Sequence, residues 1–239
     1  MATVSELGET WNTTAGNKTV VATPAVNDLI VIVAGMSGWA SGDDITLADN
    51  NADGLGAYTK FGTATVPLST GGGTACALWF FVRNALIGSA TSTTFTATIS
   101  GDTGGGLTAM KVTGMVRVGV NAVRQAIGQS TQTENPPSIA FGVATLANYP
   151  LIVAVMGEDA PLALTPPTGF TETTEGSWAT PTTGINVAFL SAGSTGSTYA
   201  WSAGAVTDHN EIAVELDSSV PQEPPSLFMA PYRHQPRRI

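Results

Sequence analysis

Leu29-Ile30-Val31-Ile32-Val33-Ala34 is an unbroken apolar run in which four consecutive residues are β-branched. A run of this kind is typical of a central strand covered on both faces, since a half-exposed strand would alternate apolar and polar residues. A second run, Leu151-Ile152-Val153-Ala154-Val155-Met156, has the same character. The sequence therefore predicts two equivalent central strands.

The segments around the two runs correspond in the same order along the chain. The corresponding ranges are 19–23 with 138–143, 58–60 with 170–172, 75–80 with 185–190, 94–98 with 198–202, and 106–111 with 211–216. We therefore expect two repeats, about 18–113 and about 136–217, within one body of residues 1–219. Two separate domains are the alternative, although residues 113–135 do not have the composition of a linker.

Short apolar or alternating segments separated by glycine-rich turns favour a β-sandwich or barrel. We predict an all-β fold: an antiparallel, jelly-roll-like β-sandwich built from two pseudo-symmetric repeats. Residues 1–17 are expected to be irregular and residues 35–56 to form a long loop, while the glycines at 71–73 and 104–106 should form turns. The spacing of Val120, Val123 and Ile127 predicts one short helix over 118–127.

The charge of the chain is low and unevenly distributed. Charged residues make up 11% of it, and the formal net charge is −9. Residues 1–222 carry six basic and 17 acidic side chains, whereas residues 223–239 carry three basic and one acidic. An acidic body argues against a nucleic-acid-binding surface, which needs basic groups to neutralise phosphates. A neutral surface rich in small residues suits a protein packed in an assembly.

The N-terminal residues have neither the basic nor the apolar region of a signal peptide. No apolar run approaches the roughly 20 residues of a membrane-spanning helix. The expectation is a protein made in a cytoplasm and not exported by a standard route. Cys76 is the single cysteine, so an intrachain disulfide is excluded, and we expect it to be a small buried apolar group.

The last part of the chain, 220–239, differs from the body because it is rich in proline and basic. Its prolines disfavour helix and central strand and favour an extended form. We predict an arm that docks on a neighbouring subunit, and a free tail is the alternative. The predicted partner-binding residues are Leu227, Phe228, Met229, Tyr232, Arg233, Arg237 and Arg238.

The order of strands and turns resembles a family of double-repeat β-sandwich domains found in tailed-phage virion structural proteins of the head-decoration or minor-tail type, and in bacterial surface proteins. The resemblance covers residues ~18–217 and is carried by residues 27–34, 58–60, 76–80, 94–98, 166–172 and 192–196. It implies a fold and a virion context, with other virion proteins as partners and a homo-oligomeric lattice. It implies no site residues, because the shared motifs are turns and strands.

Three short motifs could carry chemistry. Asp49-Asn50-Asn51-Ala52-Asp53-Gly54 matches the first half of a calcium loop, but the twelfth position is Lys60, where a bidentate Glu is needed. A solvated Asx-rich loop is favoured, and a weak loop-bound cation stays open. Gly16-Asn17-Lys18-Thr19 resembles the end of a phosphate loop, but it lacks the preceding glycine and the βαβ context. His209 has carboxylate neighbours, yet one histidine cannot form a structural zinc site, so we expect a solvated loop histidine.

Aromatic residues offer a second class of function. Trp39 and Trp178 are expected in loops after corresponding strands, where they could stack on a glycan. Tyr199 and Trp201 alternate on one strand face, and core packing is favoured for them. No nucleophile, base and acid set is recognised, so we predict no catalytic, cofactor or metal residues.

The sequence thus predicts a non-enzymatic bacteriophage virion structural protein, a capsid decoration protein that packs on a head lattice through its sandwich and arm. The alternative is a minor tail or tail-tip protein with a receptor- or glycan-binding sandwich. The expected partners are major capsid or tail proteins, without nucleic acid or membrane. Assembly is expected in the host cytoplasm.

Overall fold

The computed structural model describes residues 1–40, 42–62, 76–101, 104–131, 136–157, 163–179, 182–202 and 208–219. Within these ranges the regular structure is β-strand, apart from one short 3-10 helix, η1, at Gly119–Ala122. The strands are β1 Thr3–Asn12, β2 Lys18–Ala22, β3 Leu29–Ser37, β4 Ile45–Asp49, β5 Tyr58–Phe61, β6 Cys76–Arg83, β7 Thr93–Ile99, β8 Gly104–Thr113, β9 Val123–Thr131, β10 Ser138–Ala140, β11 Leu151–Gly157, β12 Thr171–Ala179, β13 Thr182–Leu190, β14 Thr198–Ala200 and β15 His209–Leu216. The predicted all-β class is confirmed.

The first half of the chain forms a jelly-roll-like sandwich. A five-stranded antiparallel sheet has the order β1-β8-β3-β6-β5, and a three-stranded sheet has the order β2-β7-β4. Along the chain the strands alternate between the two sheets, except that β5 and β6 are consecutive and pair within the large sheet. This interleaving is the strand arrangement of a jelly roll.

The second half has a large sheet of equivalent strand order and a smaller second sheet. Its five-stranded sheet has the order β9-β15-β11-β13-β12, and β10 pairs with β14 in a small sheet. An isolated bridge between Thr165 and Ser202 continues the small sheet beyond β14. Taken in chain order, the strands of the two large sheets occupy equivalent places, with β3 and β11 at the centre of each.

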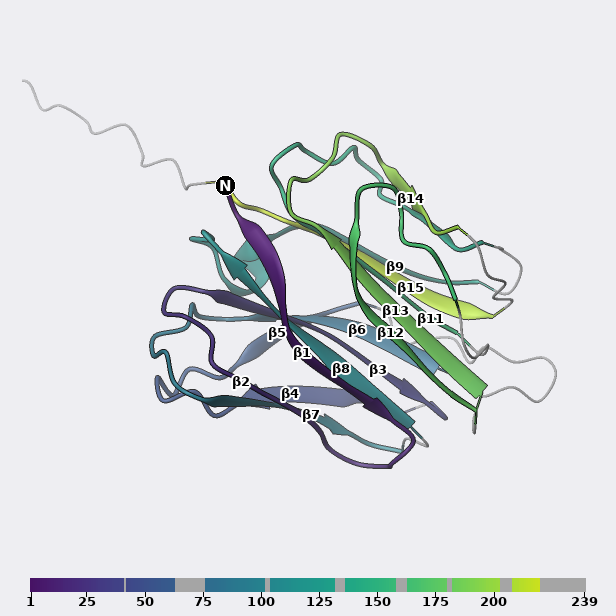
Figure 1. Cartoon of the computed structure of the whole chain (residues 1–239), viewed down its shortest axis with the longest axis horizontal. Coiled ribbons are helices and arrows are strands. Elements are labelled where there is room, and N and C mark those ends of the chain that lie inside the picture. The colour runs from purple at the N-terminus through teal and green to yellow at the C-terminus, as the bar shows by residue number, and fades with distance from the viewer. Residues whose placement is uncertain are drawn as a thin grey trace, which may run out of the picture.

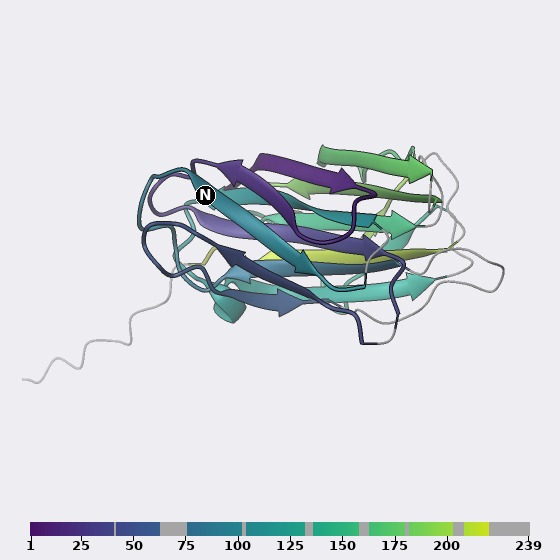
Figure 2. The same ribbon diagram turned by 90° about the horizontal axis from the view of Figure 1, so that it is seen from below.

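The four sheets stack as layers, with the two large sheets in the middle (Figures 1 and 2). Between the large sheets lies one apolar cluster that includes Val31 and Phe80 from the first half and Ile152 and Val214 from the second. We call this cluster the shared core. A second cluster lies between the first large sheet and β2-β7-β4, and a third lies beneath β10 and β14. Each half therefore has its own core and contributes one sheet face to the shared core.

This layering explains the apolar runs that identify the central strands. Leu29 and Val33 of β3 face the shared core, while Ile30 and Ile32 face the cluster under the small sheet. Every residue of β3 and of β11 is buried. Alternate residues point to opposite faces of a strand, so a strand with apolar layers on both sides needs an unbroken apolar run.

Two segments expected to be irregular contain strands. Residues 3–12 form the edge strand β1, which pairs with β8 along its length. Its polar residues are explained by this edge position, because many of its side chains are only partly buried. Residues 45–49 form β4 inside the predicted loop 35–56, and β3 itself continues to Ser37.

The glycines at 104–106 belong to a strand instead of the predicted turn, whereas residues 71–73 lie outside the described ranges. Gly105 pairs with Met36 and Gly106 pairs with Gly35 across β8 and β3. A Cβ atom at Gly106 would lie 2.0 Å from the carbonyl oxygen of Thr10 and 2.6 Å from the ring of Trp11. Glycine is required here because β1 approaches β8 closely, and not because the chain reverses.

The helix predicted over 118–127 is wrong beyond its first turn. Only Gly119–Ala122 is helical, and Val123 begins the edge strand β9. A β-bulge at Arg124 shifts the register between Val123 and Gln125. As a result Val123 packs on the shared core and Ile127 on the third cluster, so the two side chains lie on opposite faces of β9, whereas a helix would place them on one face.

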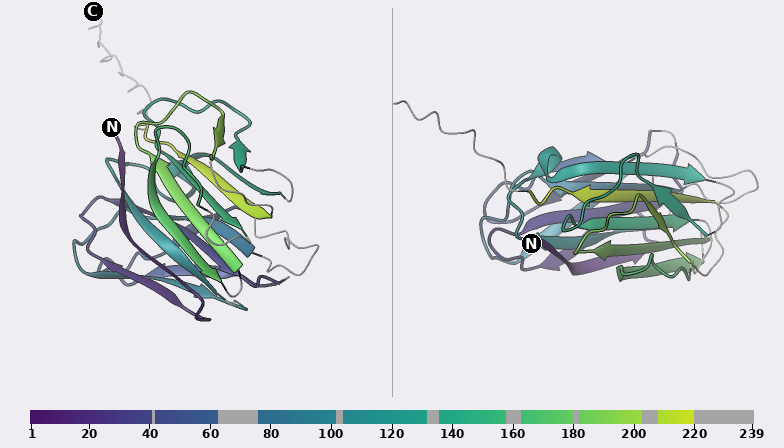
Figure 3. Two further views of the ribbon diagram at one scale, coloured as in Figure 1. Left: turned by 45° about the vertical axis from the view of Figure 1, so that its right-hand side comes forward. Right: turned by 90° about the horizontal axis from the view of Figure 1, so that it is seen from above.

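Both ends of the described chain lie at one end of the stack (Figure 3). Thr3 pairs with Thr113 at the end of β8. Arg117 Nε donates to the carbonyl oxygen of Ser219 at 3.1 Å, and the amide of Asp217 donates to Ala122 in η1. We call this the terminal end of the molecule.

Candidate functional site

The Asx-rich loop after β4 is organised around a buried arginine. Arg83, the last residue of β6, has no exposed surface. Its Nε donates to Asp49 Oδ2 at 2.8 Å, and its Nη2 donates to Asp53 Oδ1 at 2.6 Å. Arg83 Nη1 donates to Asp53 Oδ2 at 3.1 Å and to the carbonyl oxygens of Ala85 and Leu86. The guanidinium thus occupies the centre of the loop that was expected to be solvated, with a weak loop-bound cation as the open alternative.

The carboxylate of Asp53 is held from several sides. It accepts hydrogen bonds from the backbone amides of Leu55 at 2.9 Å and Gly88 at 2.8 Å, in addition to those from Arg83. The hydrogen bond from Arg83 lowers the pKa of Asp53 to about 2 and outweighs burial, which on its own would raise it. Asp53 is therefore ionised at neutral pH and pairs with a charged guanidinium.

Asp49 is held in the same way and has a second donor. The Tyr58 hydroxyl donates to Asp49 Oδ2 at 2.7 Å. Burial, with a further contribution from the nearby Asp49 carboxylate, raises the pKa of Tyr58 well above its ordinary value. All three nitrogens of Arg83 donate to protein oxygens, so the cluster presents no free guanidinium edge to an anion. We interpret Asp49, Asp53 and Arg83 as a structural ion cluster, which corrects the expectation of a solvated loop.

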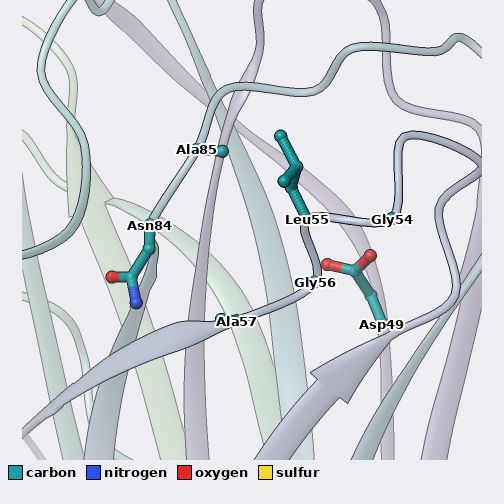
Figure 4. A pocket seen from close by; sticks show the side chains of 7 residues that line it. All are labelled: Asp49, Gly54, Leu55, Gly56, Ala57, Asn84 and Ala85. Carbon is teal, nitrogen blue, oxygen red and sulfur yellow. The ribbon is translucent and has the colours of Figure 1, made fainter.

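A pocket opens beside this cluster at the terminal end. It has a volume of about 480 Å³ and is lined by Asp49, Gly54, Leu55, Gly56, Ala57, Asn84 and Ala85. In Figure 4 the loop from Gly54 to Ala57 forms one wall, and Asn84 and Ala85 stand opposite it. The Leu55 side chain projects from this loop and is 55% exposed. The Asp49 side chain is fully buried and engaged by Arg83, so the accessible lining is small, apolar and amide in character.

The helix η1 connects this pocket to the point where the described chain ends. A Cβ atom at Gly119 would lie 2.6 Å from Asn84 Oδ1, so η1 lies directly against the pocket wall. At the other end of η1, Ala122 accepts the hydrogen bond from Asp217. Arg117 forms an ion pair with Asp217 at 3.3 Å and holds Ser219. Asp217 and Ser219, two of the last described residues of the chain, therefore lie beside η1, which itself contacts the pocket wall.

His209 is completely buried, contrary to the expectation of a solvated loop histidine. It is the first residue of β15, where it pairs with Gly157 of β11 and Thr131 of β9. Loss of hydration lowers the pKa of His209 to about 4. Within the described part of the chain, neither ring nitrogen has a hydrogen-bond partner, and Glu211 Oε1 lies 4.0 Å from Nε2. This position makes His209 a neutral core residue at neutral pH.

Cys76 takes part in a polar contact between the two halves. It is fully buried, as predicted, and Asn210 Nδ2 donates to its carbonyl oxygen at 2.6 Å. The Cys76 thiol donates to the carbonyl oxygen of Met156 at 3.4 Å. These hydrogen bonds cross the shared core and help to fix the two large sheets relative to each other.

The two tryptophans of the glycan hypothesis belong to different halves of the stack. Trp39 packs on the second apolar cluster, and its Nε1 donates to the carbonyl oxygen of Asp43 at 3.3 Å. Trp178 lies within β12, so the predicted loop position is wrong, and its side chain is outside the described part of the structure. Tyr199 and Trp201 are buried in the third cluster, as predicted.

Lys18 of the phosphate-loop-like motif is buried at the start of β2. Its ammonium group donates to Asn12 Oδ1 at 3.0 Å and to the carbonyl oxygen of Thr14. Lys18 thus stabilises the turn between β1 and β2. Lys60, which stands where a calcium loop needs Glu, pairs with Asp44 at the surface.

The predicted arm residues, Leu227, Phe228, Met229, Tyr232, Arg233, Arg237 and Arg238, lie outside the described residues. In the eight described segments, no group of three or more His, Cys, Asp or Glu side chains is placed to hold a metal ion. No helix among those segments is long and apolar enough to cross a membrane. A scan of family models finds none that matches the chain, and a search of curated proteins finds no significant relative.

Proposed function

We propose that this chain is a non-enzymatic structural protein of a tailed-bacteriophage virion, a decoration protein that packs on the head lattice. The observation that carries the proposal is the pair of stacked jelly-roll-like sandwiches. Jelly rolls are recurrent building blocks of viral coats, because paired sheets give a compact unit that presents loops for lateral contacts. The same architecture also occurs in binding and catalytic proteins, so the chemistry of the site has to decide among these roles.

The charged clusters support a structural role over a catalytic one. Arg83 is saturated by protein oxygens, and Glu215 is held by Arg124, Gln125 and the amide of Leu146. In these two clusters of the described chain, the charged groups are therefore engaged by protein partners instead of standing open to a substrate. An enzyme would instead place a nucleophile or base in a cleft with access to a ligand.

The proposed partners are other virion proteins, in the first place the major capsid protein, and further copies of the chain in an oligomeric lattice. Assembly takes place in the host cytoplasm, without nucleic acid or membrane as a partner. The acidic, weakly charged body argues against direct contact with packaged DNA. The basic segment 223–239 provides a complementary group for an acidic neighbour.

A tail or tail-tip protein that binds a receptor or a glycan is the alternative function. It receives less support, because Trp39 packs against the body instead of standing free as a stacking platform. Binding of a glycan to the isolated protein, measured on a glycan array and lost in Trp39→Ala, would favour this alternative.

The arm gives the most direct genetic test of the proposal. Deleting residues 221–239 should abolish incorporation into virions, measured by mass spectrometry of purified particles, while the melting temperature of the body stays unchanged. A matched variant that keeps the length of the arm, with Leu227, Phe228 and Met229 each changed to Ser, should give the same loss. Incorporation of both variants at the level of the unchanged protein would refute the role of the arm.

A further inference from the structure

The pocket beside Arg83 has the chemistry of a docking site for an apolar peptide. Its accessible walls are formed by Leu55, Ala57 and Ala85, and Gly54, with nothing within 4 Å of its Cβ position, lets a ligand approach the backbone. Asn84 at the edge supplies an amide group. The guanidinium of Arg83 is closed off by Asp49 and Asp53, so the site favours apolar and backbone contacts over a small anion.

The described chain ends next to this pocket. Arg117 fixes Ser219 through two hydrogen bonds of 3.1 Å. Between this point and Asn84 lies η1, whose four residues span roughly 8 Å at the rise of about 2 Å per residue of a 3-10 helix. An extended chain covers at most about 3.5 Å per residue, so the segment from Ser219 to Leu227 can span roughly 28 Å. The first apolar residues of the C-terminal segment can therefore reach the pocket of their own chain.

We infer that the pocket lined by Leu55, Ala57 and Ala85 is the docking site of this chain's own C-terminal segment, with Leu227-Phe228-Met229 as the group that enters it. This inference rests on the proposed function and deepens it by giving the arm a bound state on the free protein. Docking keeps the apolar residues of the arm covered until a neighbouring virion protein competes for them.

Charge and tethering support the same occupant. Residues 1–222 have a net charge of −11 and residues 223–239 a net charge of +2, and the cluster behind the pocket carries two carboxylates for one guanidinium. A short flexible tether gives an effective concentration on the order of millimolar, so even weak docking within one chain is well populated. A free peptide of another protein would need a far higher affinity to occupy the pocket at ordinary concentrations.

The test measures disulfide formation within the full chain. Ala57→Cys places an exposed thiol at the pocket, and Ser226→Cys places one beside the apolar group of the arm. Under mild oxidation at low protein concentration, this double variant should form its intrachain disulfide at least ten times faster than a double variant with Ala15→Cys and Ser226→Cys. Ala15 is exposed in the turn after β1, at the opposite end of the stack. Native Cys76 is buried and common to both.

A pocket variant provides the second control. Leu55→Asp removes an exposed apolar wall without touching the core or the tether, and it should slow the disulfide between positions 57 and 226 severalfold. An unchanged rate in Leu55→Asp would overturn the inference, because tethering alone would then account for the disulfide, and so would equal rates at positions 57 and 15. A disulfide whose rate rises in proportion to protein concentration would also overturn it, because the occupant would then be a second copy. The isolated protein can pass or fail this test whether or not it is found in virions, so failure of the docking and failure of the proposed function are distinguishable.

Discussion

At the scale of single residues, the loop after β4 is held together by charged groups that are buried and paired. Arg83 closes β6, the most apolar strand of the first half, and draws Asp49 and Asp53 around itself. The sequence showed an Asx-rich loop and suggested water or a cation as its partner. The partner is 30 residues away along the chain, and spacing within the loop cannot show it. The sequence did offer one signal for a buried ion pair, which is Arg83, a charged residue at the end of an apolar strand.

Removing Arg83 should destabilise the fold strongly. Arg83→Met leaves two carboxylates in a buried site without their partner, and breaking such a pair costs on the order of 3–5 kcal/mol. The control is Lys60→Met, because Lys60 pairs with Asp44 at the surface, where a pair contributes roughly 0–1 kcal/mol. Urea unfolding of both variants measures the difference. Small and equal decreases in the free energy of unfolding of the two variants would show that the cluster is not structural.

His209 should make the stability of the protein depend on pH between about 4 and 6.5. Its pKa is about 4 in the folded protein and near 6.5 when unfolded, so the unfolded state binds more protons in this window. The free energy of unfolding should therefore fall as the pH is lowered from 6.5 to 4, by up to about 1.4 kcal/mol per pH unit. His209→Gln should remove this slope, measured by urea unfolding at a series of pH values.

The second histidine offers a matched control for that measurement. His234 lies in the C-terminal segment, and His234→Gln should leave the slope in place. A slope that persists in His209→Gln and disappears in His234→Gln would contradict the assignment.

At the scale of elements, strands with strong apolar runs were predictable and edge strands were not. β3, β6 and β11 have two buried faces, so their sequences identify them. β1 and β9 lie at sheet edges with mixed burial, and each contains a β-bulge that breaks the alternation of side chains. Their positions follow from pairing with β8 and β15, which is information outside their own sequences.

The glycine-rich start of β8 should be sensitive to any side chain. Gly106→Ala would push a Cβ atom into the backbone of Thr10 and the ring of Trp11, so we expect a loss of roughly 1–3 kcal/mol or displacement of β1. Gly142→Ala is the control, since nothing lies within 4 Å of its Cβ position. Thermal unfolding compares the two variants. If Gly106→Ala has the same melting temperature as Gly142→Ala, the close approach of β1 to β8 is not maintained in solution.

At the scale of the whole molecule, the two halves share one core and should unfold together. Phe80 of β6 lies in the shared core against residues of β11 and β15. The repeat in the sequence indicated two similar halves, but the choice between one body and two domains needs the contact between the sheets. The faces that meet are apolar in both halves, and composition alone does not show which of the apolar faces pair.

Phe80→Ala should therefore destabilise both halves equally, by roughly 3–5 kcal/mol. Hydrogen exchange measures this, because amides of β3 and of β11 report on opening of the first and second halves. We expect the same decrease in protection in both strands. A decrease confined to β3 would show that the halves open as independent domains.

The virion role is the central claim, and it is tested most directly by locating the protein on particles. Cryo-electron microscopy of virions purified from the producing host should show a density of two stacked β-sandwiches repeated at lattice positions on the head. Density of this shape on the tail or tail tip would instead support the receptor-binding alternative. Absence of the protein from purified virions, checked by mass spectrometry of the same particles, would contradict the claim.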